Sequence, residues 1–453
     1  MNFADKTVLV YGMGISGRGV AALLKRAGAS MVLYDGNKDL DKAALLDELG
    51  LAADTRVILG ELTRQDLEGV DLLALSPGVS INAPNVRMAQ ENGVDILGEL
   101  EIAYELSKGR ILAITGTNGK TTTTALTGEI MKAAFDSVFV VGNIGKSFAS
   151  VALDTQEDSV IVAEVSSFQL ETIRDFHPTV SAITNLTPDH LDRHGTFENY
   201  ALCKMKIAQN QTANEKCIIN YDDVYLRELS KDIPAEPLYF SRLEKLDKGI
   251  YLDGDDIVYS DGSQTVKIMN KHNMNLLGDH NVENVMTAIG LSLAIGVPVE
   301  TIANVVRDFK AVEHRIEYVC TKNGVKYYND SKGTNTDAAA KAVGSMVSPT
   351  VLIAGGYDKG ADFTDWIKGF DGKIKDMILI GQTAEKIRDT ALACGFTAIH
   401  MEPDLKAAVK KAAELAEEGD AVLLSPACAS WGQFKNYEQR GEMLFQENQF
   451  FLY

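Results

Sequence analysis

Cysteine, long apolar runs and basic residues are all scarce in this sequence. The five cysteines lie far apart and form no CxxC pair, so neither a disulfide framework nor a zinc–cysteine site is expected. No apolar run is long enough to predict a membrane-spanning helix. Asp5 and Lys6 precede the first short apolar stretch, which is not the pattern of a signal peptide. Together these absences predict a cytoplasmic protein without membrane insertion.

Lysine and arginine number 44, against 63 aspartates and glutamates, which gives a formal net charge of −19. A surface of this sign disfavours nucleic acid and anionic membranes, so neither is an expected partner. A small anionic ligand stays compatible with it, because a pocket can differ in sign from the whole surface.

The length and the pattern of apolar runs indicate several α/β domains. A single core rarely exceeds about 300 residues, so two or three domains are expected. Short β-rich runs alternate with segments of helical period, which is typical of parallel sheets. Polar breaks at Ser107–Arg110 and near Lys310–Arg315 predict domains at 1–109, 110–312 and 313–453. The expected strands include Val8–Tyr11, Met31–Tyr34, Leu72–Leu75, Ile111–Thr115, Val138–Val141, Val160–Glu164, Val180–Thr184, Val351–Ala354, Met377–Ile380 and Ala421–Leu424. Hairpins are expected at Asp253-Gly254, Asp261-Gly262 and Asn323-Gly324.

A first glycine motif, Gly12–Gly17 (GMGISG), follows the first expected strand and opens a helix. Glycines allow a tight turn and a close approach to a phosphate, and the helix start offers free N–H groups. Asp35 ends the next strand, where its carboxylate can reach a ligand hydroxyl or ring N–H. NAD(P), another nucleotide diphosphate and a tight turn without any ligand all fit this motif.

A second glycine motif, Thr115–Thr122 (TGTNGKTT), also lies between a strand and a helix. Backbone N–H groups of such a loop surround phosphates, Lys120 neutralises their oxygens, and the Thr121 hydroxyl can bind Mg²⁺. Ile114 stands where the common phosphate loop has its first glycine, which indicates a particular subfamily of ATP-binding loops. A dehydrogenase needs only the first motif and a simple ATPase only the second. An enzyme that uses ATP to activate a substrate with its own diphosphate needs both.

Further segments fall in order along almost the whole chain and resemble the Mur ligases. They are Glu164–Glu171 (EVSSFQLE), Asn185–Arg193 (NLTPDHLDR), Asp330–Asn335 (DSKGTN), Gly355–Gly360 (GGYDKG) and Ser425–Ser430 (SPACAS). The resemblance implies a Rossmann-like N-terminal domain that binds UDP, a central P-loop ATPase-type domain, and a Rossmann-like C-terminal domain that brings an amino acid. SSFQLE and SPACAS look like the family member that adds D-glutamate.

That member forms an amide from the alanine carboxylate of UDP-N-acetylmuramoyl-L-alanine, through an acyl phosphate made with ATP. The resemblance therefore implies ATP and two Mg²⁺ ions as cofactors, and UDP-N-acetylmuramoyl-L-alanine and D-glutamate as partners of a monomer. It assigns catalysis to Lys120, Glu164, His190 and Lys204, and the metal ions to Thr121, Glu164, His190 and a carbamylated Lys204. Lys204 falls on the apolar face of an expected helix, Phe197–Gln211, where desolvation favours the neutral amine that can react with CO₂. His194 matches no role.

The ligand contacts implied by the resemblance fall into three sets. Those for ATP are Gly116, Thr117, Asn118, Gly119, Lys120, Thr121, Thr122, Asn281, Arg315, Asp330 and Lys332. Those for the UDP-substrate are Gly14, Ile15, Ser16, Asp35, Ser76, Pro77, Gly78, Asn143, Ser166 and His190. Those for D-glutamate are Lys332, Thr334, Lys359, Ser425 and Phe434.

Two positions depart from the family pattern: Gly333 replaces a common alanine, and Gly432 replaces a common aspartate before Phe434. The first is expected to be neutral, and the second concerns the local geometry near Phe434. Three alternatives stay open at this point. They are another Mur-type or folylpolyglutamate-type ligase, an NAD(P)-binding regulatory or redox protein that uses the first glycine motif, and a non-catalytic scaffold.

Overall fold

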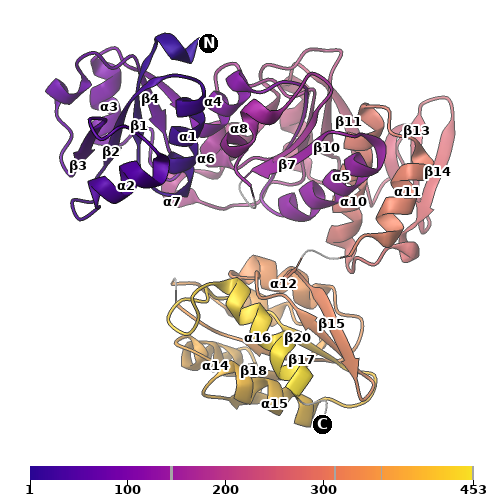
Figure 1. The fold of residues 1–453 in the computed structure, drawn as a ribbon. Helices are drawn as coiled ribbons and strands as arrows, with labels where there is room; N and C mark the ends of the chain where they lie inside the picture. The colour runs from indigo at the N-terminus through magenta and orange to yellow at the C-terminus, as the bar shows by residue number, and fades with distance from the viewer. Residues whose placement is uncertain (143–145, 311–312, 359, 451–453) are drawn as a thin grey trace. The chain divides into compact units, whose positions relative to one another are not determined.

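The computed structural model describes residues 1–142, 146–310, 313–358 and 360–450. They form three α/β sheets that follow one another along the chain, as the sequence predicts (Figure 1). The chain divides into two compact units. The first comprises Met1–Lys271 with Glu283–Val306 and holds the first two sheets, and the second comprises His272–Val282 with Arg307–Tyr453 and holds the third. The predicted boundaries at 109/110 and 312/313 stay predictions.

The first sheet is parallel, with the strand order β3-β2-β1-β4-β5. Helices α1, α2 and α4 bury apolar side chains in one core, and α3 contributes to another. The chain runs outwards from β1 to β3 and then returns to β4, so loops that follow β1 and β4 diverge at a switch point, where such sheets bind ligands. The strands are β1 (Thr7–Tyr11), β2 (Ser30–Asp35), β3 (Arg56–Leu59), β4 (Leu72–Leu75) and β5 (Asp95–Gly98). The helices are α1 (Ile15–Arg26), α2 (Lys42–Leu49), α3 (Pro84–Glu91) and α4 (Glu99–Leu106).

The second sheet has nine strands in the order β14-β13-β12-β11-β10-β9-β6-β8-β7. It is parallel from β7 to β12 and ends in two antiparallel hairpins at the predicted turns. Every residue of β8 is buried, as expected for a strand covered on both faces. The strands are β6 (Arg110–Thr115), β7 (Val138–Gly142), β8 (Val160–Glu164), β9 (Val180–Ile183), β10 (Lys216–Asn220), β11 (Glu236–Ser241), β12 (Lys248–Asp253), β13 (Asp256–Asp261) and β14 (Thr265–Asn270). The helices are α5 (Lys120–Ala134), α6 (Ser167–Leu170), α7 (Leu191–His194), α8 (Phe197–Met205), α9 (Val224–Leu229), α10 (Asp279–Ala294) and α11 (Val299–Asp308).

The third sheet has the order β15-β16-β20-β17-β18-β19, and only the β15–β16 hairpin is antiparallel. Helices α12, α13 and α14 contribute to one core, and α15 and α16 contribute to another. The strands are β15 (Glu317–Lys322), β16 (Val325–Asn329), β17 (Thr350–Ala354), β18 (Ile374–Leu379), β19 (Ile399–Met401) and β20 (Ala421–Leu424). The helices are α12 (Thr336–Gly344), α13 (Thr364–Lys368), α14 (Ala384–Ala393), α15 (Leu405–Leu415) and α16 (Tyr437–Phe450).

The helix expected over Phe197–Gln211 is shorter than predicted. Helix α8 ends at Met205 and tightens into a 3₁₀ turn over Lys206–Ala208. The Gln211 side chain instead accepts a hydrogen bond from Ser181 and donates to the Pro178 and Lys216 carbonyls. The chain therefore leaves the helix to bind the strand ends, which propensity alone does not predict.

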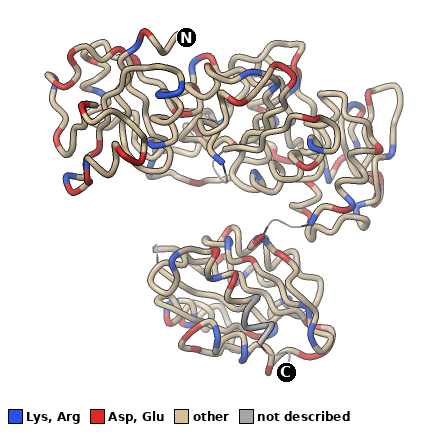
Figure 2. The backbone as a smooth tube through the Cα atoms, in the orientation of Figure 1, with Lys and Arg blue, Asp and Glu red and all other residues tan. Residues whose placement is uncertain are grey.

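Acidic and basic side chains are interspersed along the chain, with the acidic ones in excess (Figure 2). Among the residues described, no helix combines the length and apolarity that crossing a bilayer requires.

Candidate active site

The second glycine loop joins β6 to α5 and has a shape that requires glycine at two positions. Gly116 has φ +142° and Gly119 has φ +84°. A Cβ atom at Gly116 would lie 2.0 Å from Thr184 Oγ1, and one at Gly119 would lie 2.0 Å from Asn284 Oδ1. Both glycines therefore permit a close approach that any side chain would block.

The end of β9 fixes this loop through hydrogen bonds. Thr117 N donates to Asn185 O (2.9 Å), and Asn118 N donates to Asn185 Oδ1 (2.9 Å). Thr184 Oγ1 donates to Asn118 O (2.6 Å). The backbone of the loop is thus held in one shape before any ligand arrives, which lowers the cost of binding one.

Lys120 and the two threonines after it begin α5. Lys120 Nζ donates to Gly116 O (2.8 Å) and Thr117 O (2.9 Å), which holds the ammonium over the loop. Thr121 is half-buried and Thr122 is buried. A helix start combined with an ammonium favours an anion at this place.

Two predicted catalytic residues lie close to Lys120. Glu164 ends β8, is 3% exposed and pairs with Ile114 of β6. Lys204 on α8 is 2% exposed, and its Nζ lies 3.4 Å from Thr115 Oγ1 and 4.8 Å from the centre of the Tyr200 ring. Parallel pairing brings the ends of β6 and β8 together, so Glu164 lies beside the strand that leads into the loop of Lys120.

Burial, and then the nearby Lys120 charge, hold the pKa of Lys204 well below its ordinary value of 10.5, although Asp189 and Glu164 act in the opposite direction. A lysine in this setting is inclined to the neutral amine. We call Lys120, Glu164 and Lys204 the phosphate-loop cluster.

The two histidines near α7 have different surroundings. His190 has a left-handed backbone (φ +50°), is exposed, and places its ring edge on Phe168 at 4.8 Å between centres. The His194 side chain is 4% exposed and lies 3.0 Å from Ser167 Oγ. Burial lowers the pKa of His194. His190 is therefore the histidine that a ligand can reach, and His194 connects α7 to α6.

The first glycine loop follows β1, and its partner loop follows β4. Ser76 Oγ donates to Gly12 O (3.3 Å), so the two loops touch. Asp35 accepts hydrogen bonds from the backbone N–H groups of Met13 (2.7 Å) and Asn37 (2.8 Å), so it fixes the loop itself. The remaining predicted contacts for the UDP-substrate in this region are Gly14, Ile15 and Ser16 at the start of α1, and Pro77 and Gly78 after Ser76.

Ser166 and Glu99 are two further polar residues of the first unit. Ser166 caps α6 and exchanges hydrogen bonds with Gln169 in a capping box. Glu99 is 4% exposed and accepts hydrogen bonds from the Ser16 and Ser147 side chains, while burial raises its pKa. Glu99 could not be singled out from the sequence, because a buried glutamate looks like any other acid at a helix start. Asn143 lies outside the described residues.

In the second unit, Asp330 is buried after β16 and accepts a 2.7 Å hydrogen bond from Ser425 Oγ. Burial raises the pKa of Asp330 to about 7, although Ser425 and the charge of Arg315 lower it. Arg315 lies between two residues with left-handed backbones, His314 (φ +62°) and Ile316 (φ +48°). Such a backbone is costly for a β-branched residue and is typical of functional sites. The buried Arg315 Nε has no hydrogen-bond partner among the described residues, which fits a residue that awaits a ligand.

Arg440 on α16 is a residue that the sequence analysis missed. It is 0% exposed and donates to Ser331 Oγ (3.0 Å), Ser331 O (2.7 Å) and Cys428 O (3.1 Å). It therefore ties the loop after β16 to the loop after β20. Buried arginines are rare, so one sequence gives no reason to expect one here. We call Asp330, Ser331, Ser425 and Arg440 the third-sheet cluster.

The other predicted residues of this unit have mixed surroundings. Lys332 Nζ lies 5.4 Å from the centre of the Tyr437 ring, and Thr334 N donates to Lys332 O. The half-buried Phe434 packs against the core of α15 and α16. Buried Asn281 donates to Leu277 O (2.7 Å). Lys359 lies outside the described residues.

The two glycine departures differ. A Cβ atom at Gly333 would lie 2.3 Å from Asp330 Oδ2, whereas one at Gly432 would meet nothing within 4 Å, although its φ is +88°. An alanine at position 333 would therefore displace the Asp330 carboxylate or the loop, and the expectation that Gly333 is neutral stays a prediction.

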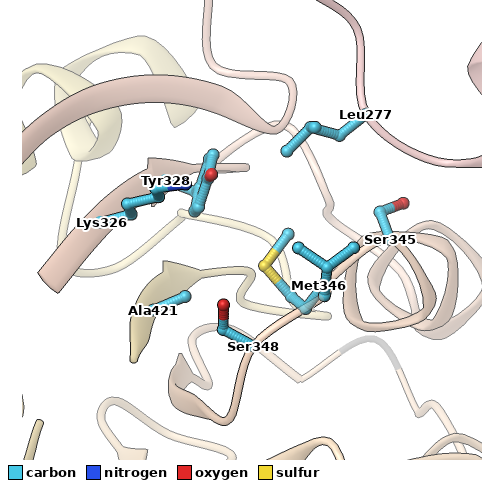
Figure 3. A pocket seen from close by; sticks show the side chains of 8 residues that line it. Leu277, Lys326, Tyr328, Ser345, Met346, Ser348 and Ala421 are labelled. Carbon is cyan, nitrogen blue, oxygen red and sulfur yellow. The ribbon is translucent and has the colours of Figure 1, made fainter. Parts of the chain in front are cut away.

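Two pockets in this unit lie away from the predicted residues. One has a volume of about 10 Å³ and is surrounded by side chains from the sheet and from the turn after α12 (Figure 3). A larger open one, of about 1000 Å³, borders β15 and β16. None of the residues that line either pocket is a predicted ligand contact.

Family models match all three parts of the chain. A Mur ligase MurD-like N-terminal domain matches residues 6–98, a Mur ligase middle domain matches 114–292, and a Mur ligase glutamate ligase domain matches 314–428. The chain belongs to the Mur ligase family.

Two curated relatives illustrate the similarity. Proteins named UDP-N-acetylmuramoylalanine–D-glutamate ligase from Lachnospira eligens and Lachnoclostridium phytofermentans are 52% and 49% identical, over 98% and 99% of this chain and 98% of each relative. Among solved structures, UDP-N-acetylmuramate-alanine ligase MurC from Thermotoga maritima has a TM-score of 0.60 at 18% identity, covering 98% of this chain and 99% of its own. A pseudomurein peptide ligase type C from Methanothermus fervidus has 0.57 at 19% identity, covering 93% and 96%. Both solved structures share the fold of this chain. The family assignment decides against the redox and scaffold alternatives.

Proposed function

We propose that this chain is an ATP-dependent ligase that joins D-glutamate to UDP-N-acetylmuramoyl-L-alanine, a step of peptidoglycan precursor synthesis. The observation that carries the proposal is the 52% identity, over 98% of both chains, to a protein named for this reaction. The phosphate-loop cluster supports it. The loop, the lysine and the buried carboxylate that phosphoryl transfer requires follow or end the neighbouring strands β6 and β8.

A carboxylate is a poor electrophile, so amide formation requires its activation. The alanine carboxylate attacks the γ-phosphate of ATP, ADP leaves, and an acyl phosphate forms. The amine of D-glutamate then attacks the acyl carbon, a proton is released, and phosphate leaves. In the first step Lys120 and the N–H groups of the glycine loop hold the phosphate oxygens, which requires positioning and charge neutralisation rather than a covalent step.

The residues of the cluster suit Mg²⁺. Glu164 in the cluster and Thr121, the residue after Lys120, offer the hard oxygen donors that Mg²⁺ prefers, and the His190 side chain is exposed to a ligand. Bound there, two Mg²⁺ ions would neutralise charge on the transferring phosphate. Thr121 and Glu164 would hold the first ion. His190 and Lys204 would hold the second, provided that Lys204 is carbamylated.

Carbamylation of Lys204 has physical support. The amine is buried, and its lowered pKa favours the neutral form that attacks CO₂. The product is an anion, which replaces the repulsion between Lys204 and Lys120 with an attraction. Labelling with ¹³C-bicarbonate should give a carbamate carbon signal in the wild type that is absent from Lys204→Ala.

The remaining assignments are part of the same proposal. Asn281, Arg315, Asp330 and Lys332 contact ATP, while the first glycine loop, Asp35, the Ser76–Gly78 turn, Asn143, Ser166 and His190 receive the UDP-substrate. Lys332, Thr334, Lys359, Ser425 and Phe434 receive D-glutamate. The protein is a cytoplasmic monomer with domains at 1–109, 110–312 and 313–453.

The test is phosphate release with Mg-ATP and UDP-N-acetylmuramoyl-L-alanine, with D-glutamate, L-glutamate, L-alanine or L-lysine added separately. Release and a new UDP-linked product only with D-glutamate are expected. Turnover with another amino acid would show that D-glutamate is not the substrate, but it would still support an ATP-dependent ligase reaction. No turnover with any of them would contradict the proposal.

A further inference from the structure

Arg193 joins the loop after β4 to the segment that contains His190. Its Nη2 donates to the backbone carbonyl of Val79 (2.8 Å) and to Glu171 Oε2 (2.6 Å), and its Nε lies 3.1 Å from Glu171 Oε1. The Arg193 and Glu171 side chains are 15% and 13% exposed. A bidentate arginine–carboxylate pair that is mostly buried is stronger than an ion pair at the surface and holds both side chains in one orientation.

On one side, Arg193 holds the turn on which the first glycine loop rests. Val79 N donates to Ser76 O (3.0 Å), which closes this turn, and Ser76 Oγ donates to Gly12 O (3.3 Å). The Val79 carbonyl that binds Arg193 therefore belongs to the same turn that contacts the glycine loop. A shift of Arg193 would be transmitted through a short chain of direct contacts.

On the other side, Arg193 fixes the position of His190. Its guanidinium lies 5.2 Å from the centre of the Phe168 ring, and the centre of the His190 ring lies 4.8 Å from the centre of the same ring. Arg193 N also donates to His190 O (3.1 Å). The left-handed backbone of His190 is thus held by the short helix that Arg193 anchors.

We propose that Arg193, held by Glu171, is a positioning residue that couples occupation of the first-sheet substrate site to the placement of His190. The proposal rests on the proposed function for the identity of that substrate, UDP-N-acetylmuramoyl-L-alanine. Arg193 itself touches neither substrate nor metal in this account. Its effect passes through the Ser76–Val79 turn and through Phe168.

The first experiment compares the steady-state kinetics of Arg193→Ala, Arg193→Lys and Glu171→Gln. Loss of a charged hydrogen bond should raise the KM for the UDP-substrate and lower kcat by about tenfold each in Arg193→Ala, with the KM for ATP unchanged. A lysine cannot make a bidentate contact with Glu171 and bind Val79 O at the same time. The kinetic effects of Arg193→Lys should therefore lie between those of the wild type and Arg193→Ala. The double variant Arg193→Ala/Glu171→Gln should be no worse than Arg193→Ala, because the pair acts as one unit.

Arg26→Ala is the matched control. Arg26 also connects α1 to the middle part of the chain, through a 2.5 Å pair with Asp154, but it lies at the far end of that helix and is half-exposed. Its kinetic constants should equal those of the wild type. An equal effect of Arg26→Ala, or a parallel rise in the KM for ATP, would show general loosening of the fold and overturn the proposal.

The second experiment needs no activity. Hydrogen exchange of the ligand-free protein should be faster at the amides of residues 79–82 in Arg193→Ala and unchanged in Arg26→Ala. Unchanged exchange in Arg193→Ala would contradict the tether even if the enzyme is active. Faster exchange together with an inactive wild type would support the role of the Arg193–Val79 contact and reject the proposed function. Failure of this inference and failure of the proposed function therefore give different results.

Discussion

The phosphate-loop cluster and the third-sheet cluster both follow parallel strands, but they use polar groups in opposite ways. In the first, two lysine side chains lie near each other, and burial together with the Lys120 charge lowers the pKa of Lys204. In the second, the polar groups satisfy one another: Ser425 donates to Asp330, and Arg440 donates three hydrogen bonds to two loops. The first cluster brings lysine side chains together beside a glycine loop, whereas the second also holds two loops in place through buried hydrogen bonds. Polar residues that follow parallel strands therefore differ in how far they stabilise the fold.

Replacing Lys120 with alanine should have the largest effect on activity. The expected fall in kcat is on the order of 10³-fold, because a charge that stabilises the transferring phosphate is lost. Stability should change little, since the Lys120 Nζ bonds to Gly116 O and Thr117 O are to neutral loop carbonyls. Product formation and urea unfolding measure the two. Lys132→Ala on the same helix, in an exposed pair with Glu129, is the control. Strong destabilisation by Lys120→Ala would show that the phosphate-loop cluster also stabilises the fold, which would contradict the difference between the two clusters.

Replacing Arg440 with alanine should have the largest effect on stability. It would remove the donors that bind the buried Ser331 and Cys428 carbonyls and leave a cavity, and a loss of about 3–5 kcal/mol is expected. Both tryptophans, Trp366 and Trp431, belong to the third-sheet unit, so their fluorescence follows its unfolding in urea. Exposed Arg388, paired with Asp389, provides the control, and Arg388→Ala should stay within about 0.5 kcal/mol of the wild type. A cost below that of the control would show that the third-sheet cluster is not a support.

The Asp330→Asn variant tests the pH dependence of the third-sheet cluster. Folded Asp330 keeps its proton up to about pH 7, whereas the ordinary aspartate value is 3.8. Between these values the folded state binds more protons than the unfolded state, so the contribution of Asp330 is complete below the lower value and is lost as pH rises through the upper one. The unfolding free energy of the wild type relative to Asp330→Asn should therefore fall by up to about 4 kcal/mol across that window. A flat difference between acid and neutral pH would contradict the raised pKa.

Gly333→Ala should have the smallest effect of the four. Its Cβ atom would meet Asp330 Oδ2 at 2.3 Å, so the carboxyl or the loop must move, at about 1–3 kcal/mol. Gly344→Ala, at the end of α12 and with nothing within 4 Å of the new atom, should be neutral or slightly stabilising. Equal thermal stability of the two variants would show that the loop relaxes freely and that Gly333 is a neutral departure.

The sequence predicted the three sheets because apolar runs and Asn-Gly or Asp-Gly turns carry strong local signals. The resemblance to the Mur ligases implied that Lys120, Glu164 and Lys204 share a site, and parallel pairing explains why the ends of β6 and β8 meet. It could not predict Arg193–Glu171 or Arg440, because these depend on contacts between segments far apart in sequence. The helix end at Met205 was missed for the same reason, since Gln211 is drawn away by distant strand ends.

The hairpins at the edge of the second sheet have a consequence for association between copies of the protein. An outer strand offers unpaired backbone groups on which another chain could build. On β14, Thr265, Val266 and Lys267 are exposed, and the Lys267 ammonium is paired with Asp256 at 2.6 Å. A second strand docking there would have to desolvate that ion pair, so this edge resists sheet extension and aggregation.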